Sequence, residues 1–239
     1  MLTKSRIIVL HTIKHSDSGV VVQCYSDTKG RTACYFYPKS KQSKSSVTFP
    51  LNILDVVLHS KRGGESTMPL IKEADTVFPL ADIQIDIRKN AIALYMCELI
   101  LRSVRESEPD TGLFAFLTNS VLILNEIKEG CENFHLHFTV NLCKLLGYMP
   151  QDNYSTERKH FNFTQAQFVE KYQEAFCFAP DESQLLHTIL STPLKDIPTV
   201  KCNGELRNRF LTKVLEYFSF HSALKTELKS LGVLRELFI

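Results

Sequence analysis

The chain has 239 residues, with 28 Lys and Arg against 26 Asp and Glu, and 44% of its residues are hydrophobic. That apolar content supplies a packed core for one large or two small domains, and it excludes a largely disordered chain. The most apolar run, 91–101, contains Glu98 and is shorter than the roughly 20 residues that cross a bilayer. The first residues also lack the apolar segment of a signal peptide, so we expect a soluble, cytoplasmic protein with no membrane partner.

The first third of the chain has the pattern of a small β-barrel. Over 7–13, the residues Ile7, Val9, His11 and Ile13 alternate with Ile8, Leu10 and Thr12, and β-branched residues dominate, as is typical of a strand. Gly19 and the segment 27–30 have the residues of tight turns. The pattern predicts strands over 7–13, 20–25, 31–37, 49–60 and 68–77. Five short strands of this kind favour an OB-fold barrel over residues 1–80.

From Leu80 onward the apolar spacing becomes helical, which predicts an all-α domain over residues 81–239 and an α+β protein as a whole. The first helix begins at Asp82 or Asp86. Further helices are expected over 113–127, 133–146, 165–176 and 182–191, from 203 onward, and over 224–237. Gly147, with Pro150 beyond it, predicts the end of the 133–146 helix.

Charge is divided unevenly along the chain. Residues 1–80 carry 11 Lys and Arg against 6 Asp and Glu, a net charge of +5, and the remaining residues carry 17 against 20, a net charge of −3. A basic N-terminal module indicates a polyanionic partner. Single- and double-stranded DNA would be bound through phosphates by Lys4, Arg6, Lys14, Arg31, Lys39, Lys41 and Lys44.

The loop 38–46 is the centre of this hypothesis, because three lysines fall within six positions between small polar residues. The alternative is an ordinary solvated loop. Aromatic residues between the cations are typical of single-stranded nucleic-acid binding, although aromatics at alternating strand positions more often belong to a core. The candidate stacking side chains are Tyr25, Tyr35, Phe36 and Tyr37.

Neither a metal site nor a cofactor is expected. The seven cysteines are scattered and form no C-x-x-C pair, so we expect them to be buried, reduced thiols. His135 and His137, two residues apart on an expected helix, face different sides. Phosphate-binding glycine loops and hydrolase motifs are missing from the sequence. A non-enzymatic binding protein is favoured, and a metal- or thiol-dependent enzyme with an unrecognised site remains an alternative.

Basic residues beside apolar helices suggest a second binding surface. Such a surface suits an acidic peptide that ends in a hydrophobic residue, and we expect Arg102, Lys144 and Arg207 to hold it. Arg105, Lys128 and Arg209 lie in similar settings. The alternative is that these cations only compensate helix dipoles at helix ends.

Several segments, taken together, resemble the RecO family of bacterial recombination mediators over nearly the full chain. Their order and spacing carry the resemblance. The segments are Thr3-Lys4-Ser5-Arg6-Ile7-Ile8-Val9-Leu10, the lysine loop 39–44, Pro50-Leu51-Asn52-Ile53-Leu54-Asp55-Val56-Val57, Leu145-Leu146-Gly147-Tyr148-Met149-Pro150 and the tail 228–238.

The resemblance implies an OB domain followed by a helical domain, and binding and annealing of DNA strands without nucleotide hydrolysis. It also implies binding to the Phe-terminated tail of single-stranded-DNA-binding protein, and joint action with RecR so that RecA loads onto DNA near the nucleoid. Many members carry a four-cysteine zinc module after the segment that ends here at Pro150. This chain has no cysteine between Cys143 and Cys177, so we expect the segment 160–168 to replace that module. The other alternative outside recombination is a DNA-binding regulator, but no helix-turn-helix with a basic recognition face is evident.

Overall fold

The computed structural model describes residues 1–40, 45, 47–60, 68–105, 108–222 and 227–238. Contacts between residues divide the chain into two compact units, and each unit is made of two separate stretches of sequence. The first unit comprises Met1–Ile85 and Val104–Leu122, and the second comprises Asp86–Ser103 and Ile123–Ile239. The expected division into functional domains at residue 80 stays a prediction.

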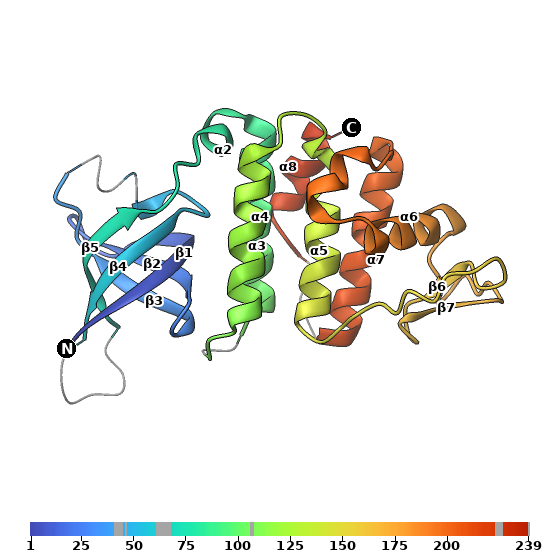
Figure 1. Ribbon diagram of the computed structural model, residues 1–239, viewed down its shortest axis with the longest axis horizontal. Coiled ribbons are helices and arrows are strands. Elements are labelled where there is room, and N and C mark those ends of the chain that lie inside the picture. Colours follow the sequence, from blue (N-terminus) through green and yellow to red (C-terminus); the bar gives the residue numbers. More distant parts are fainter. Residues whose placement is uncertain (41–44, 46, 61–67, 106–107, 223–226, 239) are drawn as a thin grey trace. The chain divides into compact units, whose positions relative to one another are not determined.

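The first unit contains a closed five-stranded barrel (Figure 1). Its strands are β1 (Leu2–Lys14), β2 (Val20–Ser26), β3 (Gly30–Phe36), β4 (Ile53–His59) and β5 (Leu70–Thr76). They follow the order β1-β2-β3-β5-β4, and every pair is antiparallel except β3 with β5. The prediction of an OB-fold barrel is therefore confirmed.

Strand β1 is long because it closes the barrel on both sides. Its first half pairs with β4, from Leu2 opposite His59 to Ile8 opposite Ile53, and its second half pairs with β2. The register shifts between Val9 and His11, a bulge that bends the strand from one neighbour toward the other. This bend lets thirteen consecutive residues serve two ladders.

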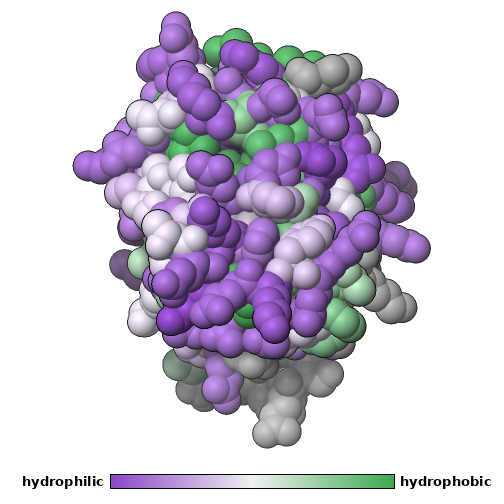
Figure 2. All heavy atoms as spheres, turned by 90° about the vertical axis from the view of Figure 1, so that its right-hand side faces the viewer, coloured by the Kyte–Doolittle hydropathy of each residue, from purple (hydrophilic) through white to green (hydrophobic). Residues whose placement is uncertain are grey.

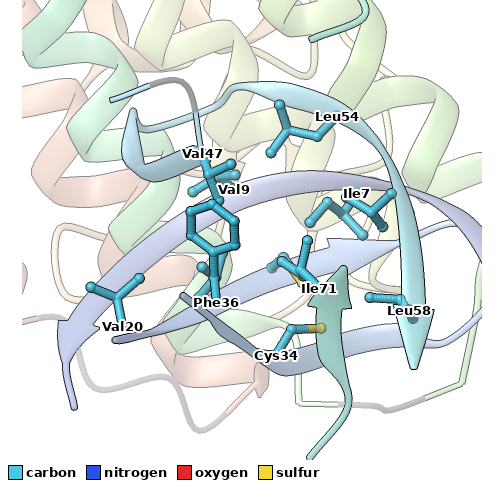
Figure 3. Packing of buried hydrophobic residues seen from close by; sticks show 12 residues of the cluster. Ile7, Val9, Val20, Cys34, Phe36, Val47, Leu54, Leu58 and Ile71 are labelled. Atoms are coloured by element: carbon cyan, nitrogen blue, oxygen red, sulfur yellow. The ribbon is translucent and has the colours of Figure 1, made fainter. Parts of the chain in front are cut away.

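The barrel interior is filled by alternate strand residues (Figure 3). Successive side chains of a strand point to opposite faces, so Cys34 and Phe36 point inward while Tyr35 between them points outward. The inward set is Ile7, Val9, Val20, Val22, Cys24, Cys34, Phe36, Val47, Leu54, Val56, Leu58 and Ile71. Burial of this set accounts for the β-branched composition that predicted the strands.

Helices make up most of the second unit. They are α3 (Ile87–Ser103), α5 (Phe134–Leu145), α6 (Pro180–Ser191), α7 (Gly204–Ser222) and α8 (Ser230–Leu237), with 3-10 turns η1 (Cys131–Asn133) and η2 (Leu194–Thr199). Helix α2 (Ala81–Ile85) belongs to the barrel unit, and α4 (Thr111–Glu126) begins in that unit. No helix among the described residues is long and apolar enough to pass through a membrane.

Helix α5 is the most buried helix of the second unit, with nine of its twelve residues buried. It ends as the sequence predicts. Gly147 adopts a left-handed φ of 88°, and the Tyr148 amide donates to the Cys143 carbonyl at 2.8 Å. The Gly147 amide donates to the Lys144 carbonyl at 3.1 Å, which completes a Schellman motif.

The predicted helix over 165–176 is wrong, because a small hairpin takes its place. Strands β6 (His160–Asn162) and β7 (Gln167–Val169) pair antiparallel. The Asn162 side chain accepts hydrogen bonds from the amides of Thr164 and Gln165, which fixes the turn between the strands. The last helix also starts later than predicted, at Ser230 rather than Leu224, while residues 223–226 lie outside the described residues.

Aromatic packing anchors this hairpin to the helices. The Phe161 ring lies edge-on against Phe168, Phe178 and Tyr217, with ring centroids 5.1–5.6 Å apart. The four rings are buried. This aromatic cluster gives the segment 160–168 a hydrophobic core of its own. The sequence predicts that this segment stands in place of a zinc module, and the cluster agrees with that expectation.

Candidate nucleic-acid interface

The seven cations predicted to bind DNA do not form one patch. Lys41 and Lys44 lie outside the described residues. The other five fall at three places on the barrel unit. Lys14 and Lys39 line one pocket, Lys4 and Arg6 line another, and Arg31 contacts the segment that follows α3.

The Lys14 and Lys39 pocket is formed where β1 turns into β2 and where β3 ends. The amides of His15 and Ser16 both donate to the Gly19 carbonyl, at 3.0 and 3.1 Å, which closes the turn. A side chain at Gly19 would place its first carbon 2.6 Å from the Tyr37 ring, so glycine lets that ring pack closely on the turn. The turn is thereby fixed against the end of β3.

The pocket has a volume of about 310 Å³ and suits a phosphate group. Its polar lining is Lys14, Ser16, Asp17, Ser18, Lys39 and Ser40. Two ammonium groups face one carboxylate, and the Lys14–Asp17 ion pair of 3.2 Å is so exposed that it adds little to stability. Lysine can therefore turn from Asp17 to a phosphate at small cost, while the serine hydroxyls supply neutral donors.

Arg31 sits near the start of β3, about 17 Å of strand from Phe36 at the other end. Its guanidinium donates to the Val104 carbonyl at 2.9 Å. Its cross-strand partner Tyr25 accepts a hydrogen bond from the Asp110 amide and stacks on Phe114. Arg31 and Tyr25 thus hold the segment 104–122 on the barrel, and Arg31 does not lie at the lysine pocket.

Lys4 and Arg6 lie on a face whose net charge is negative. Strand register aligns Arg6 with Asp55 and Asp55 with Asp75, and it aligns Val57 with both Lys4 and Glu73. The pocket here, of about 620 Å³, is lined by these two cations and by four carboxylates, which gives a net charge of two minus four, or −2. The carboxylates are Asp27, Asp55, Glu73 and Asp75.

Arg6 is further committed to a carboxylate. Its Nε and Nη2 donate to the two oxygens of Asp55 at 2.7 and 2.9 Å, a bidentate geometry. The hydrogen bond from Arg6 holds the pKa of Asp55 below its usual value, so the carboxylate is charged at neutral pH. A phosphate would have to compete with Asp55 for Arg6 and would be repelled by the neighbouring acids. We call this surface, defined by Lys4, Arg6, Asp55, Glu73 and Asp75, the acidic face.

The four candidate stacking residues separate into two kinds. Phe36 lies in the barrel core, and Tyr25 is buried beneath Phe114. Tyr35 is partly exposed, with its ring centroid 4.9 Å from that of His15, and Tyr37 is 47% exposed. Only the outward-pointing pair, Tyr35 and Tyr37, is therefore placed to reach a ligand.

The three residues predicted to hold a partner's tail lie apart in the second unit. Helices α3 and α5 both begin beside η1, so their C-terminal ends, which carry Arg102 and Lys144, point the same way. Arg207 bonds to Asn133 at the start of α5, roughly 16 Å of helix from Lys144. Arg102 pairs with Glu98 at 3.1 Å.

Arg207 is buried, and its guanidinium is used inside the unit. Nε donates to the Asn133 side chain, Nη1 to the Phe238 carbonyl and Nη2 to the Cys202 carbonyl, at 2.8–2.9 Å. The Phe238 ring also stacks on His135, 5.7 Å away. Arg207 thus holds the chain's own C-terminal segment. Its assignment to a partner's tail stays a prediction that these contacts do not favour.

The second unit shows little continuous apolar surface on the side of β6, β7 and α6. Hydrophilic side chains predominate there, with small separate hydrophobic patches (Figure 2). Exposed apolar residues of this unit include Leu145, Met149 and Phe220. Leu145 and Met149 flank the end of α5 next to Lys144, where a hydrophobic peptide terminus would find both apolar and basic groups.

The cysteines of the described residues are mostly buried and do not gather with acids or histidines into a metal-binding group. Within the described residues, no three His, Cys, Asp or Glu side chains converge as metal ligands. Six of the seven free cysteines are buried, and burial raises the pKa of the Cys131 and Cys143 thiols, so they remain protonated at neutral pH.

Comparison with known proteins identifies the family. The family model described as "Recombination protein O C terminal" matches residues 84–231. The "DNA repair protein RecO" of Bacteroides fragilis is 32% identical over 244 residues, those of Phocaeicola vulgatus and Porphyromonas gingivalis are 29% and 28% identical, and each comparison covers all of both chains. These names give a repair role and no catalytic activity. The chain therefore belongs to the RecO family of DNA repair proteins.

Proposed function

We propose that this protein is a recombination mediator that acts on DNA without catalysing a reaction of its own. It binds single- and double-stranded DNA, anneals complementary strands and, with RecR, promotes loading of RecA onto single strands coated by single-stranded-DNA-binding protein. The observation that supports this most directly is similarity to RecO proteins over the whole chain. The cytoplasm, at the nucleoid, is the compartment where this activity is required.

The barrel is the proposed DNA-binding part, and the Lys14 and Lys39 pocket is its proposed phosphate site. The acidic face would repel the same phosphates, so DNA is expected to approach from the lysine side. Lys41 and Lys44 continue the same stretch of sequence as Lys39 and stay in the proposal. Lys4, Arg6 and Arg31 are expected to contribute less, because their neighbours or partners are carboxylates or a carbonyl.

The end of α5 is the proposed site for the acidic tail of single-stranded-DNA-binding protein. Lys144 would attract the carboxylates, and Leu145 and Met149 would contact the terminal apolar side chain. Arg102 lies at the C-terminal end of α3, which points the same way as that of α5, and we propose that it assists in binding the tail. Its guanidinium also donates to Glu98, which reduces the charge that it offers.

Strand annealing tests this proposal. Complementary oligonucleotides, one of them coated with single-stranded-DNA-binding protein, are mixed with the protein in EDTA and without nucleotide. The expected result is faster annealing than without protein, lost when Lys14 and Lys39 are both changed to Ala. Strict dependence on a nucleotide or a metal, or no acceleration at all, would overturn the proposal.

A further inference from the structure

The outer surface of the barrel next to the lysine pocket carries a row of apolar side chains. Strand register aligns Ile13 on β1 with Val21 on β2, Val21 with Tyr35 on β3, and Tyr35 with Leu70 on β5. All four point outward, because their strand neighbours Val20, Cys34, Phe36 and Ile71 fill the interior. A contiguous row of this kind on the outside of a sheet is a candidate binding surface.

Only one end of this outer surface is covered within the barrel unit. At the Tyr25 and Arg31 end, the segment 104–122 lies on the strands through the Phe114 ring and the Val104 carbonyl. At the opposite end, Ile13 is 45% exposed and Tyr37 is 47% exposed. The same sheet thus has a covered half and a half that, among the described residues, is left open.

Aromatic rings at the open end contact other parts of the barrel unit. The His15 and Tyr35 rings lie 4.9 Å apart at an interplanar angle of 50°. The Tyr37 ring rests against the α-carbon side of Gly19, where a Cβ would not fit. These contacts favour the outward orientation of the rings, and a ring that is already oriented binds at a lower entropic cost.

The open surface also adjoins positive charge. Lys14 directly precedes His15, Lys39 follows Tyr37 by two residues, and both lysines line the pocket described above. A surface that places flat rings beside ammonium groups matches a ligand that alternates flat bases with phosphates. The pocket of the acidic face also has a ring, Phe114, and two cations, but its four carboxylates outnumber those cations, so it does not match a phosphate-bearing ligand.

We propose that Ile13, His15, Val21, Tyr35 and Tyr37 form an aromatic platform on which unpaired bases stack while the adjacent phosphate occupies the Lys14 and Lys39 pocket. The inference rests on the proposed function and adds a preference to it. Bases in a duplex are stacked on one another and present only their edges, so the platform binds single strands and contributes nothing to duplex binding.

A double-mutant cycle between protein and DNA tests the platform. Fluorescence anisotropy gives Kd values for an oligothymidylate, for the same strand with abasic sites in place of its bases, and for a hairpin duplex. Tyr37→Ala is expected to weaken oligothymidylate binding about 10-fold, the effect of losing one stacked base. Abasic DNA is expected to bind the variant and the wild type alike, and duplex affinity is expected to stay within about 2-fold.

Controls separate stacking from damage to the fold. Tyr37→Phe keeps the ring and is expected to bind like wild type. Tyr172→Ala removes a tyrosine of similar exposure, 45%, from the second unit and is expected to leave all three affinities unchanged. Far-ultraviolet circular dichroism and thermal melting of Tyr37→Ala check that the barrel is intact, and Tyr35→Ala provides a second variant on the same surface.

The outcomes distinguish the platform from the proposed function. If Tyr37→Ala and Tyr35→Ala bind oligothymidylate as wild type does while Lys14→Ala with Lys39→Ala binds weakly, the platform is refuted and DNA binding stands. An equal loss for abasic DNA and for oligothymidylate also refutes it, because no base contact would then be missing. If the wild-type protein binds none of the three DNAs, the proposed function itself fails.

Discussion

Replacing Arg207 with methionine tests whether this arginine is a structural residue or a partner-binding one. Methionine replaces the aliphatic part of the buried side chain and removes every hydrogen-bond donor. The Asn133 side-chain oxygen and the carbonyls of Cys202 and Phe238 then lose their hydrogen bonds at once. Because Arg207 on α7 holds the Phe238 carbonyl, and the Phe238 ring stacks on His135 of α5, the change also loosens this segment from both helices.

The expected loss of stability is about 3–5 kcal/mol. Each hydrogen bond to a charged donor contributes roughly 1.5–3 kcal/mol, and three are lost. Removing a buried charge returns part of that, because its desolvation is no longer required. The matched control is Arg209→Met, two residues further along α7. The ion pair of Arg209 with Asp181 is about half exposed and contributes at most about 1 kcal/mol.

Urea denaturation followed by far-ultraviolet circular dichroism measures both variants. Hydrogen exchange then assigns any loss to a unit, and we expect it in the unit that contains α5 and α7, with the barrel unchanged. Arg207→Met with a stability within 1 kcal/mol of wild type would refute the structural role. The same variant failing to bind the tail peptide of single-stranded-DNA-binding protein at full stability would restore the prediction from sequence.

Three further predictions concern charge and packing. Lys14→Ala with Lys39→Ala should reduce the log–log salt slope of DNA binding by roughly two, whereas Lys4→Ala should leave it unchanged. His135 is buried with its pKa lowered to about 3, so it contributes a fall in stability of about 1.4 kcal/mol per pH unit from pH 6.5 toward 3, and His135→Phe should reduce the slope measured in urea titrations by that amount. Phe161→Ala should cost about 3–5 kcal/mol in the second unit, measured likewise, and EDTA should leave the wild-type midpoint unchanged.

The contradicting results are equally specific. An undiminished slope in the double lysine variant would remove the pocket from the DNA interface. A flat pH profile in the wild-type protein would mean that His135 is accessible to protons in the folded chain. A midpoint that falls in EDTA would show that a metal, rather than the aromatic cluster, holds the hairpin.

Local sequence pattern was sufficient for the barrel and for most helices. The β-branched, apolar run over 7–13 lies in β1, where Ile7, Ile8 and Val9 are all buried, and this composition is a property of the strand alone. The end of α5 was equally predictable, because a left-handed residue followed by proline is a local signal. In these segments the local residues determine the conformation, so the expectation held.

Predictions failed or fell short where neighbours in space decide. The 165–176 segment forms a hairpin because Asn162 fixes its turn and Phe161 packs on Tyr217, fifty-six positions away in sequence. The acidic face was missed because a net charge over 1–80 adds together residues that strand register later separates. The available signal was that Asp55, Glu73 and Asp75 occupy outward positions of β4 and β5. Without the strand pairing, this signal could not show that the three acids lie on one surface.

The two-part composition of the barrel unit limits how this chain can be divided. A fragment that stops near residue 80 lacks Val104, Asp110 and Phe114, so Arg31 loses its acceptor and Tyr25 its cover. Chimeras between relatives would meet the same boundary, since a transplanted barrel fits only if its own 104–122 segment travels with it. Residues of these two stretches that contact each other are therefore expected to change together among relatives, although α3, a helix of the other unit, separates the stretches in sequence.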